Sequence, residues 1–141
     1  MPEPSFDAER FLGAQAPVWE EARAELRAGR KASHWMWFVF PQLRGLGRSP
    51  TAAFYGLDGL EDAAAYLAHP VLGARLAEAA GLLLAHRGTP AEAILGPVDA
   101  LKLRSSMTLF AAVPGAPEVF GRVLGAFFDG PCEATRATVA P

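Results

Sequence analysis

The sequence predicts a single all-α domain of about seven to eight short-to-medium helices, packed as an orthogonal bundle or in a horseshoe-like arrangement. Three observations predict this class. Apolar residues recur at three- and four-residue spacings, no segment alternates like a strand, and short spacers with Gly and Pro separate the helical patterns. At 141 residues the chain can bury a full core without a metal or disulfide. We place the domain over residues 1–141, with a tail at 1–5 and a loosely ordered C-terminus at 131–141.

The composition is that of an ordinary globular protein, with 51% hydrophobic and 20% charged residues. The near-neutral balance of 13 basic and 15 acidic side chains argues against nucleic acid as a partner, since that binding depends on neutralising phosphates. Cys132 is the only cysteine, which excludes an internal disulfide. The first residues lack the features of a signal peptide, and the apolar runs are too short to span a bilayer. We therefore expect a cytoplasmic protein with no membrane partner.

Two helices are predicted before Gly29. Asp7 is a suitable N-cap for the first, and Pro17 breaks that pattern and restarts it. Over residues 17–28 one face is apolar, and the opposite face carries Glu and Arg side chains. Gly29 suits the C-terminal end of the second helix.

The next predicted helix covers residues 33–38, with Ser33 as its N-cap. Its apolar run is compatible with a buried strand or a buried helical turn, and the helical surroundings favour the helix. The Gly residues that follow make residues 42–49 a loop. Ser49 and Pro50 then form the pattern of an N-cap followed by the first residue of a helix.

The later helices are separated by Gly, Pro and capping residues. Asp58 is the predicted N-cap of the helix over residues 60–68. Thr89 opens a capping-box pattern for a short helix that stops at Gly96. The other helices predicted in this part of the chain cover residues 71–86, 97–112 and 117–128, and a last helical turn or two falls at 133–139.

The stretch SHWMWFVFPQLRGLGRS, residues 33–49, is the first candidate site. It holds two of the three Trp residues, and packing in the core accounts for most of its large side chains. Alternatively, its rings form the floor of a pocket with polar groups on the rim, which suits a planar or phosphorylated ligand. The residues of such a pocket are His34, Trp35, Trp37, Gln42 and Arg44.

The loop at residues 45–49 adds a weaker signal to this stretch. Its backbone N–H groups, together with Arg44 and Arg48, suit a phosphate or carboxylate held ahead of the helix at Pro50. Glycine-rich loops before helices are common, however, and this loop matches neither a Walker pattern nor GxGxxG.

The segment KLRSSMTLF, residues 102–110, is the second candidate. On a helix, Lys102, Ser105 and Ser106 project on one side. Three hydroxyl groups in four residues are unusual inside a helix, because Ser and Thr compete for the backbone. Either the serines face a polar pocket, or they are small to permit close helix packing. Thr108 is expected to bond back to the preceding turn.

We hypothesise that the domain binds or processes a small anionic, nucleotide-like ligand between residues 33–49 and 99–110. No group of His, Cys or carboxylate residues has metal-ligand spacing, so neither a metal nor another cofactor is expected. If the protein is an enzyme, hydrolysis or group transfer is the simplest chemistry, with His34 or Lys102 as the acid or base.

The competing hypothesis is a non-enzymatic protein-interaction module that uses the Trp and Phe cluster as its surface. Burial of the two tryptophans around a polar hollow favours the first hypothesis, and a flat exposed patch favours the second. Either a monomer or a homodimer is compatible with the sequence.

Three segments of the chain have long and unusual sequences. They are FDAERFLGAQAPVWEEARAELRAGRKASHWMWFVFPQLRGLGRSP, YLAHPVLGARL and DALKLRSSMTLF, at residues 6–50, 66–76 and 99–110. These segments resemble a bacterial and fungal family catalogued as domain of unknown function 1810, and the resemblance covers nearly the whole chain. It implies a compact helical fold and a cytoplasmic protein of unassigned role. Some members carry the label calpastatin, but this chain lacks the repeats and the Pro- and Lys-rich composition of such an inhibitor.

Overall fold

The computed structural model describes residues 6–45 and 49–139, and these described residues form helices and loops with no strand. The helices are α1 (Ala8–Gln15), α2 (Trp19–Ala28), α3 (Met36–Val39), α4 (Pro50–Tyr55), α5 (Leu60–Ala68), α6 (Pro70–Leu84), α7 (Ala91–Leu95), α8 (Pro97–Ala111), α9 (Val119–Phe127) and α10 (Glu133–Val139). The all-α class is therefore confirmed. The described part has ten helices, more than the predicted total of seven or eight, although the sequence predicts helix in each of these ten segments.

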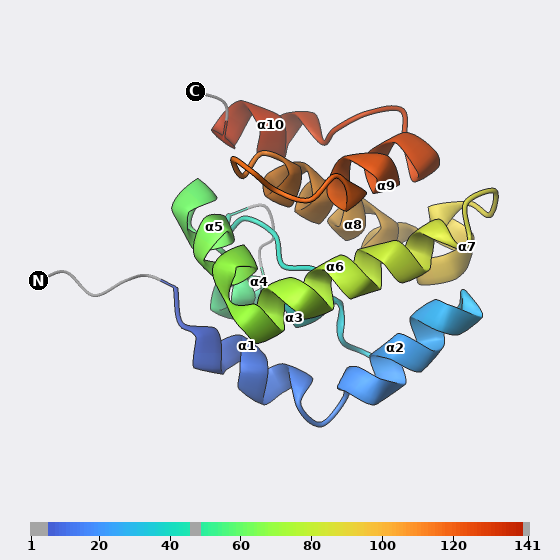
Figure 1. Cartoon of the computed structure of the whole chain (residues 1–141), viewed down its shortest axis with the longest axis horizontal. Helices are drawn as coiled ribbons and strands as arrows, with labels where there is room; N and C mark the ends of the chain where they lie inside the picture. Colours follow the sequence, from blue (N-terminus) through green and yellow to red (C-terminus); the bar gives the residue numbers. More distant parts are fainter. Residues whose placement is uncertain (1–5, 46–48, 140–141) are drawn as a thin grey trace, which may run out of the picture.

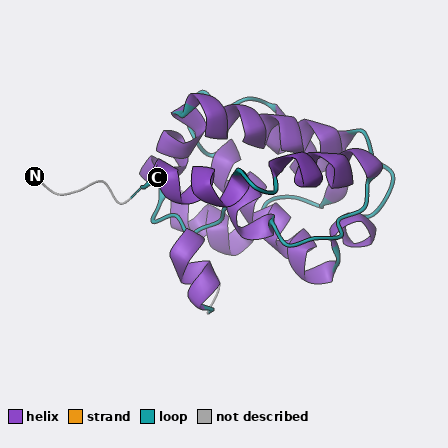
Figure 2. Ribbon diagram, turned by 90° about the horizontal axis from the view of Figure 1, so that it is seen from below, coloured by secondary structure: helices purple, strands orange, loops and turns teal. Residues whose placement is uncertain are grey.

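The helices form three layers (Figure 1). α1 and α2 lie along one side, α5 and α6 run through the middle, and α8, α9 and α10 lie on the opposite side. α6 packs against α2 in one outer layer and against α9 in the other. The view at right angles shows the same helices joined by loops (Figure 2). Within the described ranges, no single helix is long and apolar enough to cross a membrane. α5 and α6 together have the length and composition of a membrane span, but the two helices are bent by 96° relative to each other.

Several predicted helix ends are confirmed. Asp7 caps α1, because its side chain accepts a hydrogen bond from the N–H of Glu9 at 3.1 Å. Ser49 caps α4 in the same way, with its hydroxyl 3.0 Å from the N–H of Ala52. Gly29 ends α2 with a φ of 73°, a left-handed conformation that favours glycine.

Two predicted caps in the later part of the chain are wrong. Asp58 does not cap α5; its own N–H instead donates to Oδ2 of Asp62 at 2.9 Å. Thr89 does not cap α7 either, since Pro90 occupies the N-cap position without a side-chain hydrogen bond. In both places the residue that follows the predicted cap, Gly59 or Pro90, occupies the N-cap position.

The aromatic segment forms a shorter helix than predicted. α3 begins at Met36, so Ser33 is not its N-cap, and the Ser33 hydroxyl donates to Glu25 of α2 instead. The other end of α3 is held from inside the protein. The C=O of Phe38 accepts hydrogen bonds from Nε2 of Gln15 at 2.7 Å and from the hydroxyl of Tyr66 at 3.2 Å. Two different helices thus fix the direction of this segment.

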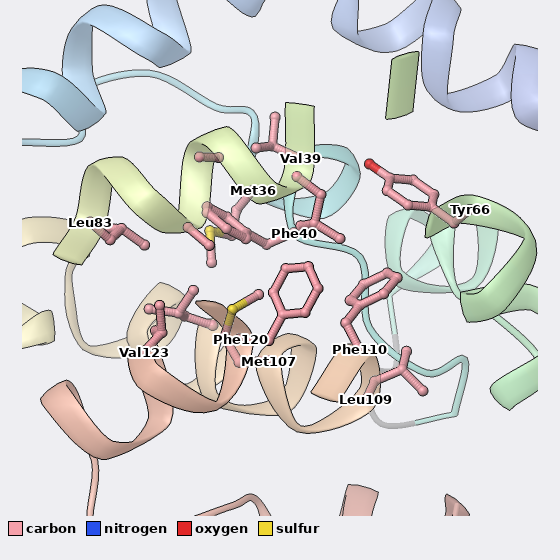
Figure 3. Packing of buried hydrophobic residues seen from close by; sticks show 14 of the residues in the cluster. Met36, Val39, Phe40, Tyr66, Leu83, Met107, Leu109, Phe110, Phe120 and Val123 are labelled. Atoms are coloured by element: carbon pink, nitrogen blue, oxygen red, sulfur yellow. The ribbon is translucent and has the colours of Figure 1, made fainter. Parts of the chain in front are cut away.

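The core is one apolar cluster that joins the three layers. The ring of Tyr66 on α5 lies 5.3 Å from that of Phe11 on α1 and 5.4 Å from that of Phe110 on α8. Phe110 in turn lies 5.9 Å from Phe120 on α9. Figure 3 shows Phe40, from the end of α3, pointing into the same apolar space. Contacts between rings at these distances stabilise the fold beyond the burial of their area.

Candidate functional site

Glu25 of α2 holds the loop that leads to the candidate aromatic residues. Its carboxylate accepts hydrogen bonds from the N–H of Ala32 (2.7 Å), from the N–H and the hydroxyl of Ser33, and from Nε1 of Trp35 (2.9 Å). Burial by itself raises the pKa of Glu25, but these hydrogen bonds outweigh it and lower the pKa to about 2. The ionised carboxylate therefore keeps Trp35, which is 1% exposed, in its place in the core.

The two lysines of the chain meet at one carboxylate. Lys31 follows α2 and Lys102 lies in α8, and the sequence contains no other lysine. Nζ of Lys31 is 2.9 Å from Oδ2 of Asp99, and Nζ of Lys102 is 3.1 Å from Oδ1 of the same residue. The backbone N–H of Lys31 donates to the C=O of Ile94 at 2.8 Å, which ties the α2–α3 loop to the end of α7.

This cluster of Lys31, Asp99 and Lys102 has an excess of positive charge. Burial by itself raises the pKa of Asp99, but hydrogen bonds from the two lysines and their charges outweigh it, so the pKa is lowered. An ionised Asp99 cancels one of the two ammonium charges, which leaves one uncompensated. The three side chains are only 9%, 18% and 18% exposed, and solvent therefore screens this charge weakly.

A small hollow of about 90 Å³ opens over this cluster, and we call it the lysine hollow. It is lined by Lys31, His34, Trp35, Met36, Trp37, Asp99 and Lys102. Nζ of Lys102 lies 4.0 Å from the centre of the Trp37 ring, within the range of a cation–π contact. His34 is exposed and has no hydrogen-bond partner among the described residues. The hollow thus combines cations, an aromatic wall and a free imidazole.

A larger groove of about 270 Å³ adjoins the lysine hollow, and we call it the cysteine groove. It is lined by Trp37, Gln42, Val98, Leu101, Lys102, Ser105 and Cys132. Trp37 and Lys102 line both spaces and separate them. Val98 and Leu101 are 64% and 67% exposed, which gives this groove an apolar rim. One ligand can therefore contact cations in the hollow and apolar side chains in the groove.

The hydroxyl groups of α8 hold the C-terminal helix and the cysteine. Oγ of Ser105 lies 2.8 Å from Oγ1 of Thr135 in α10, and Oγ1 of Thr135 donates to Sγ of Cys132 at 3.4 Å. Oγ1 of Thr108 accepts a hydrogen bond from the N–H of Cys132 at 2.8 Å. It also donates to the C=O of Arg104, as predicted for a threonine that bonds back to the preceding turn. Residues 133–139, where the sequence predicts a last helical turn or two, form α10, and Thr135 is buried there.

Comparisons with known proteins agree with this architecture. A family model described as "Protein of unknown function (DUF1810)" matches residues 5–139. The chain belongs to the DUF1810 family. It is similar to a solved structure, that of the conserved hypothetical protein Rv1873 from Mycobacterium tuberculosis, with 52% identity and a TM-score of 0.94. The match covers 98% of this chain and 99% of that chain. No curated protein matches it.

In this DUF1810 protein most of the predicted site residues lie along one surface between the α3 segment and α8. His34, Trp35, Trp37 and Lys102 line the lysine hollow. Gln42 and Ser105 line the adjoining cysteine groove. Where the sequence predicts one pocket, the described part of the chain has two neighbouring spaces that share Trp37 and Lys102 in their linings.

Two predicted residues lie elsewhere. Arg44 lines neither space, because its Nε pairs with Oδ1 of Asp58 at 2.8 Å and its Nη2 donates to the C=O of Gly56. Ser106 is fully buried, and its hydroxyl has no hydrogen-bond partner among the described residues. Of the two neighbouring serines, only Ser105 reaches the groove, because α8 turns the next position into the core. The predicted anion contact of Arg48 lies outside the described residues.

Sequence reasoning missed Lys31, Asp99 and Glu25, and it did not place Cys132 beside the site. A signal for the first two was present: the chain uses Lys at only two positions, and Asp99 stands three residues before Lys102 on the same helix. The place of Cys132 had no such signal, because it depends on how the link between α9 and α10 folds back onto α8.

Proposed function

We propose that this DUF1810 protein binds a small anionic ligand whose negative group lies at Lys31 and Lys102 and whose planar part lies against Trp37. The observation that carries the proposal is that both lysines of the chain converge on one carboxylate. One ammonium group is enough to neutralise the carboxylate of Asp99. The second ammonium leaves a positive charge next to an aromatic face in a weakly screened position, which favours an anion.

The sizes of the two spaces limit the ligand. The lysine hollow, at about 90 Å³, has room for a carboxylate or a phosphate group but not for a nucleotide. Ligand pockets usually measure about 300–1,000 Å³. A nucleotide-like ligand therefore needs the cysteine groove as well, with its planar or apolar part along Trp37 and Leu101.

If the protein turns its ligand over, His34 is the candidate acid or base. It is the titratable side chain of the lysine hollow that makes no hydrogen bond with a described residue. Lys102 fits acid–base chemistry less well than the sequence suggests, because its ammonium group is already engaged by the carboxylate of Asp99 and by the ring of Trp37. Hydrolysis or group transfer in the cytoplasm remains the reaction class that we propose for such an enzyme.

The test is a titration with pyrophosphate, AMP and citrate, followed by tryptophan fluorescence and by the melting temperature at low ionic strength. We expect at least one of these anions to raise the melting temperature, since binding to the folded state stabilises it. The variants Lys31→Met and Lys102→Met keep most of the side-chain length. Each should weaken binding by roughly tenfold or more, because a hydrogen bond to a charged group contributes about 1.5–3 kcal/mol.

Arg122→Ala is the matched control for these two variants. Arg122 is exposed on α9 and lines neither space, so its removal lowers the net charge equally without touching the site. Binding by this variant should equal that of the wild type. Equal affinities of the wild type and the two lysine variants would contradict the proposal, as would the absence of any shift with the three anions.

A second candidate function rests on the apolar rim of the cysteine groove. Trp35 and Phe40 are each 1% exposed, so the Trp and Phe cluster as a whole is not a surface. The exposed side chains are those of Val98 and Leu101, next to the half-buried Trp37. Such a rim suits a protein partner or a second copy of the chain. A melting temperature that rises with protein concentration, and no longer does so in Leu101→Ser, is the expected result for a homodimer.

A further inference from the structure

The cysteine groove is lined by both a thiol and a carboxamide, those of Cys132 and Gln42. Cys132 is the N-terminal neighbour of α10 and is half-buried in the wall of the groove. Gln42 lies across from α8 in the same lining and is only 9% exposed. The Gln42 carboxamide makes no hydrogen bond with any described residue. Its amide is not among the fully buried groups without a partner, so water reaches it in the groove, and a ligand that enters can replace that water as its hydrogen-bond partner.

The backbone around Gln42 is fixed, so its side chain starts from a defined position at the groove. The C=O of Gln42 accepts a hydrogen bond from the N–H of Leu57 at 3.0 Å, and the N–H of Arg44 donates to the C=O of Leu57 at 2.7 Å. These two bonds form an isolated parallel bridge between Leu43 and Leu57. The carboxamide is therefore presented to the groove by a rigid backbone, which is what a ligand contact requires.

The sulfur of Cys132 is surrounded by hydrogen-bond donors. The hydroxyl of Thr135 donates to Sγ at 3.4 Å. The same oxygen lies 2.8 Å from Oγ of Ser105, and with Ser105 as the donor of that bond the proton of Thr135 is available to the sulfur. Burial by itself raises the pKa of the thiol, but these donors, the backbone N–H groups of Thr135 and Ala134, and the charge of Arg104 outweigh it and lower the pKa. The thiolate, which is the nucleophilic form, is thereby favoured.

We propose that the cysteine groove is a covalent modification site in which Cys132 adds to small, uncharged α,β-unsaturated carbonyl compounds whose carbonyl oxygen is bound by Gln42. The apolar rim of Val98 and Leu101 takes the hydrocarbon part of the compound. The groove has a volume of about 270 Å³, which restricts the compounds that fit it to small molecules. The proposal is independent of an anion in the lysine hollow.

The addition needs no oxidant, no reductant and no leaving group, and water is its only other participant. Sγ of the Cys132 thiolate attacks the β-carbon, and a C–S bond forms while the electron pair of the C=C bond moves toward the α-carbon and the carbonyl oxygen. Nε2 of Gln42 donates a hydrogen bond to that oxygen, where negative charge develops. The α-carbon then takes a proton from water, and no group leaves. A hydrogen-bond donor placed at this oxygen accelerates the addition but has no role in reactions that lack a carbonyl.

The test uses the full chain, whose single cysteine gives one unambiguous adduct by mass spectrometry. Acrylamide is the carbonyl probe and 2,2′-dithiodipyridine is a thiol reagent without a carbonyl. At pH 7 the second-order rate constant of native Cys132 with acrylamide should be about threefold or more above that of N-acetylcysteine, because more of the thiol is ionised. Cys132→Ser should show no adduct. A native rate constant at or below that of N-acetylcysteine would overturn the proposal.

The variant Gln42→Leu tests whether the amide binds the carbonyl oxygen, and the reagent without a carbonyl shows whether the variant is still folded. This variant keeps the volume of the side chain, so the reaction with 2,2′-dithiodipyridine should keep the wild-type rate. The reaction with acrylamide should slow by about fivefold or more, as expected for the loss of a donor at a developing charge. If both reagents slow equally, or if acrylamide reacts at the wild-type rate, Gln42 does not bind the carbonyl and the proposed class of compound is wrong.

Discussion

Glu25 is a single side chain whose charge holds the α2–α3 loop. Its folded pKa of about 2 lies below the ordinary value of 4.5, so ionisation stabilises the folded state. That contribution is complete above the unfolded pKa and is lost as the pH falls toward 2. A pKa unit corresponds to about 1.4 kcal/mol, and solvent screening at this half-buried position reduces the total to about 1–2 kcal/mol. We expect Glu25→Gln to lower the free energy of unfolding by that amount at pH 7 in urea titrations, and by less at each pH below 4.5.

Glu21→Gln is the matched control for this prediction. Glu21 lies on the same helix, is exposed, and makes no hydrogen bond or ion pair with a described residue. Its replacement should change the free energy of unfolding by less than about 0.5 kcal/mol at any pH. A pH-independent difference between Glu25→Gln and the wild type would show that the carboxylate charge does not hold the loop.

At the scale of single residues, the sequence predicts site members better than their partners. His34, Trp37, Gln42 and Lys102 were predictable because they stand among aromatic or hydroxyl residues in short segments. Arg44 was not, because its guanidinium is taken up by Asp58, a residue that becomes its neighbour only through the fold. A sequence shows which side chains could bind a ligand or catalyse a reaction. It does not show which of them pair with another side chain in the folded protein.

The junction of α5 and α6 depends on one glycine. A Cβ atom at Gly73 would lie 2.0 Å from the carbonyl oxygen of Leu67, a backbone atom that cannot move without displacing α5. We expect Gly73→Ala to lower the free energy of unfolding by about 2–3 kcal/mol, because the added methyl group forces the two helices apart. Chemical denaturation followed by circular dichroism measures this loss.

Gly81 is the matched control for the junction, since it lies on the exposed face of the same helix. A Cβ atom there meets no other atom within 4 Å. Gly81→Ala should leave stability unchanged or raise it by about 0.5–1 kcal/mol, because Ala loses less backbone entropy in a helix. Similar losses in both variants would mean that helix propensity, and not the close approach at Leu67, governs the effect.

At the scale of helices, the long helical segments and their Gly and Pro boundaries were predictable. α6 and α8 lie within one or two residues of their expected ranges, because Pro70 and Pro97 stand in their first turns and mark where they begin. α3 was predicted too long. Its start depends on Glu25 of α2, which accepts a hydrogen bond from the Ser33 hydroxyl, so Ser33 lies outside α3. The docking of α10 likewise depends on hydroxyl groups of α8 whose partners are distant in sequence.

For the molecule as a whole, the core predicts a single cooperative unfolding transition. Phe110 contacts Tyr66 of the middle layer and Phe120 of α9, and α6 packs against helices of both outer layers. No layer can therefore separate without exposing buried apolar surface of another. The three tryptophans, Trp19, Trp35 and Trp37, all lie in α2 and α3 or beside them, so their fluorescence reports on that side of the molecule.

Circular dichroism, in contrast, reports on helices in all three layers. We expect the urea midpoints of the two signals to coincide in the wild type and to shift together in Gly73→Ala, a residue that belongs to the middle layer. A fluorescence transition at lower urea than the loss of helix would mean that α1 to α3 unfold as a separate unit. In that case the lysine hollow, which needs Lys31 on one side and Asp99 on the other, would be lost before the rest of the fold.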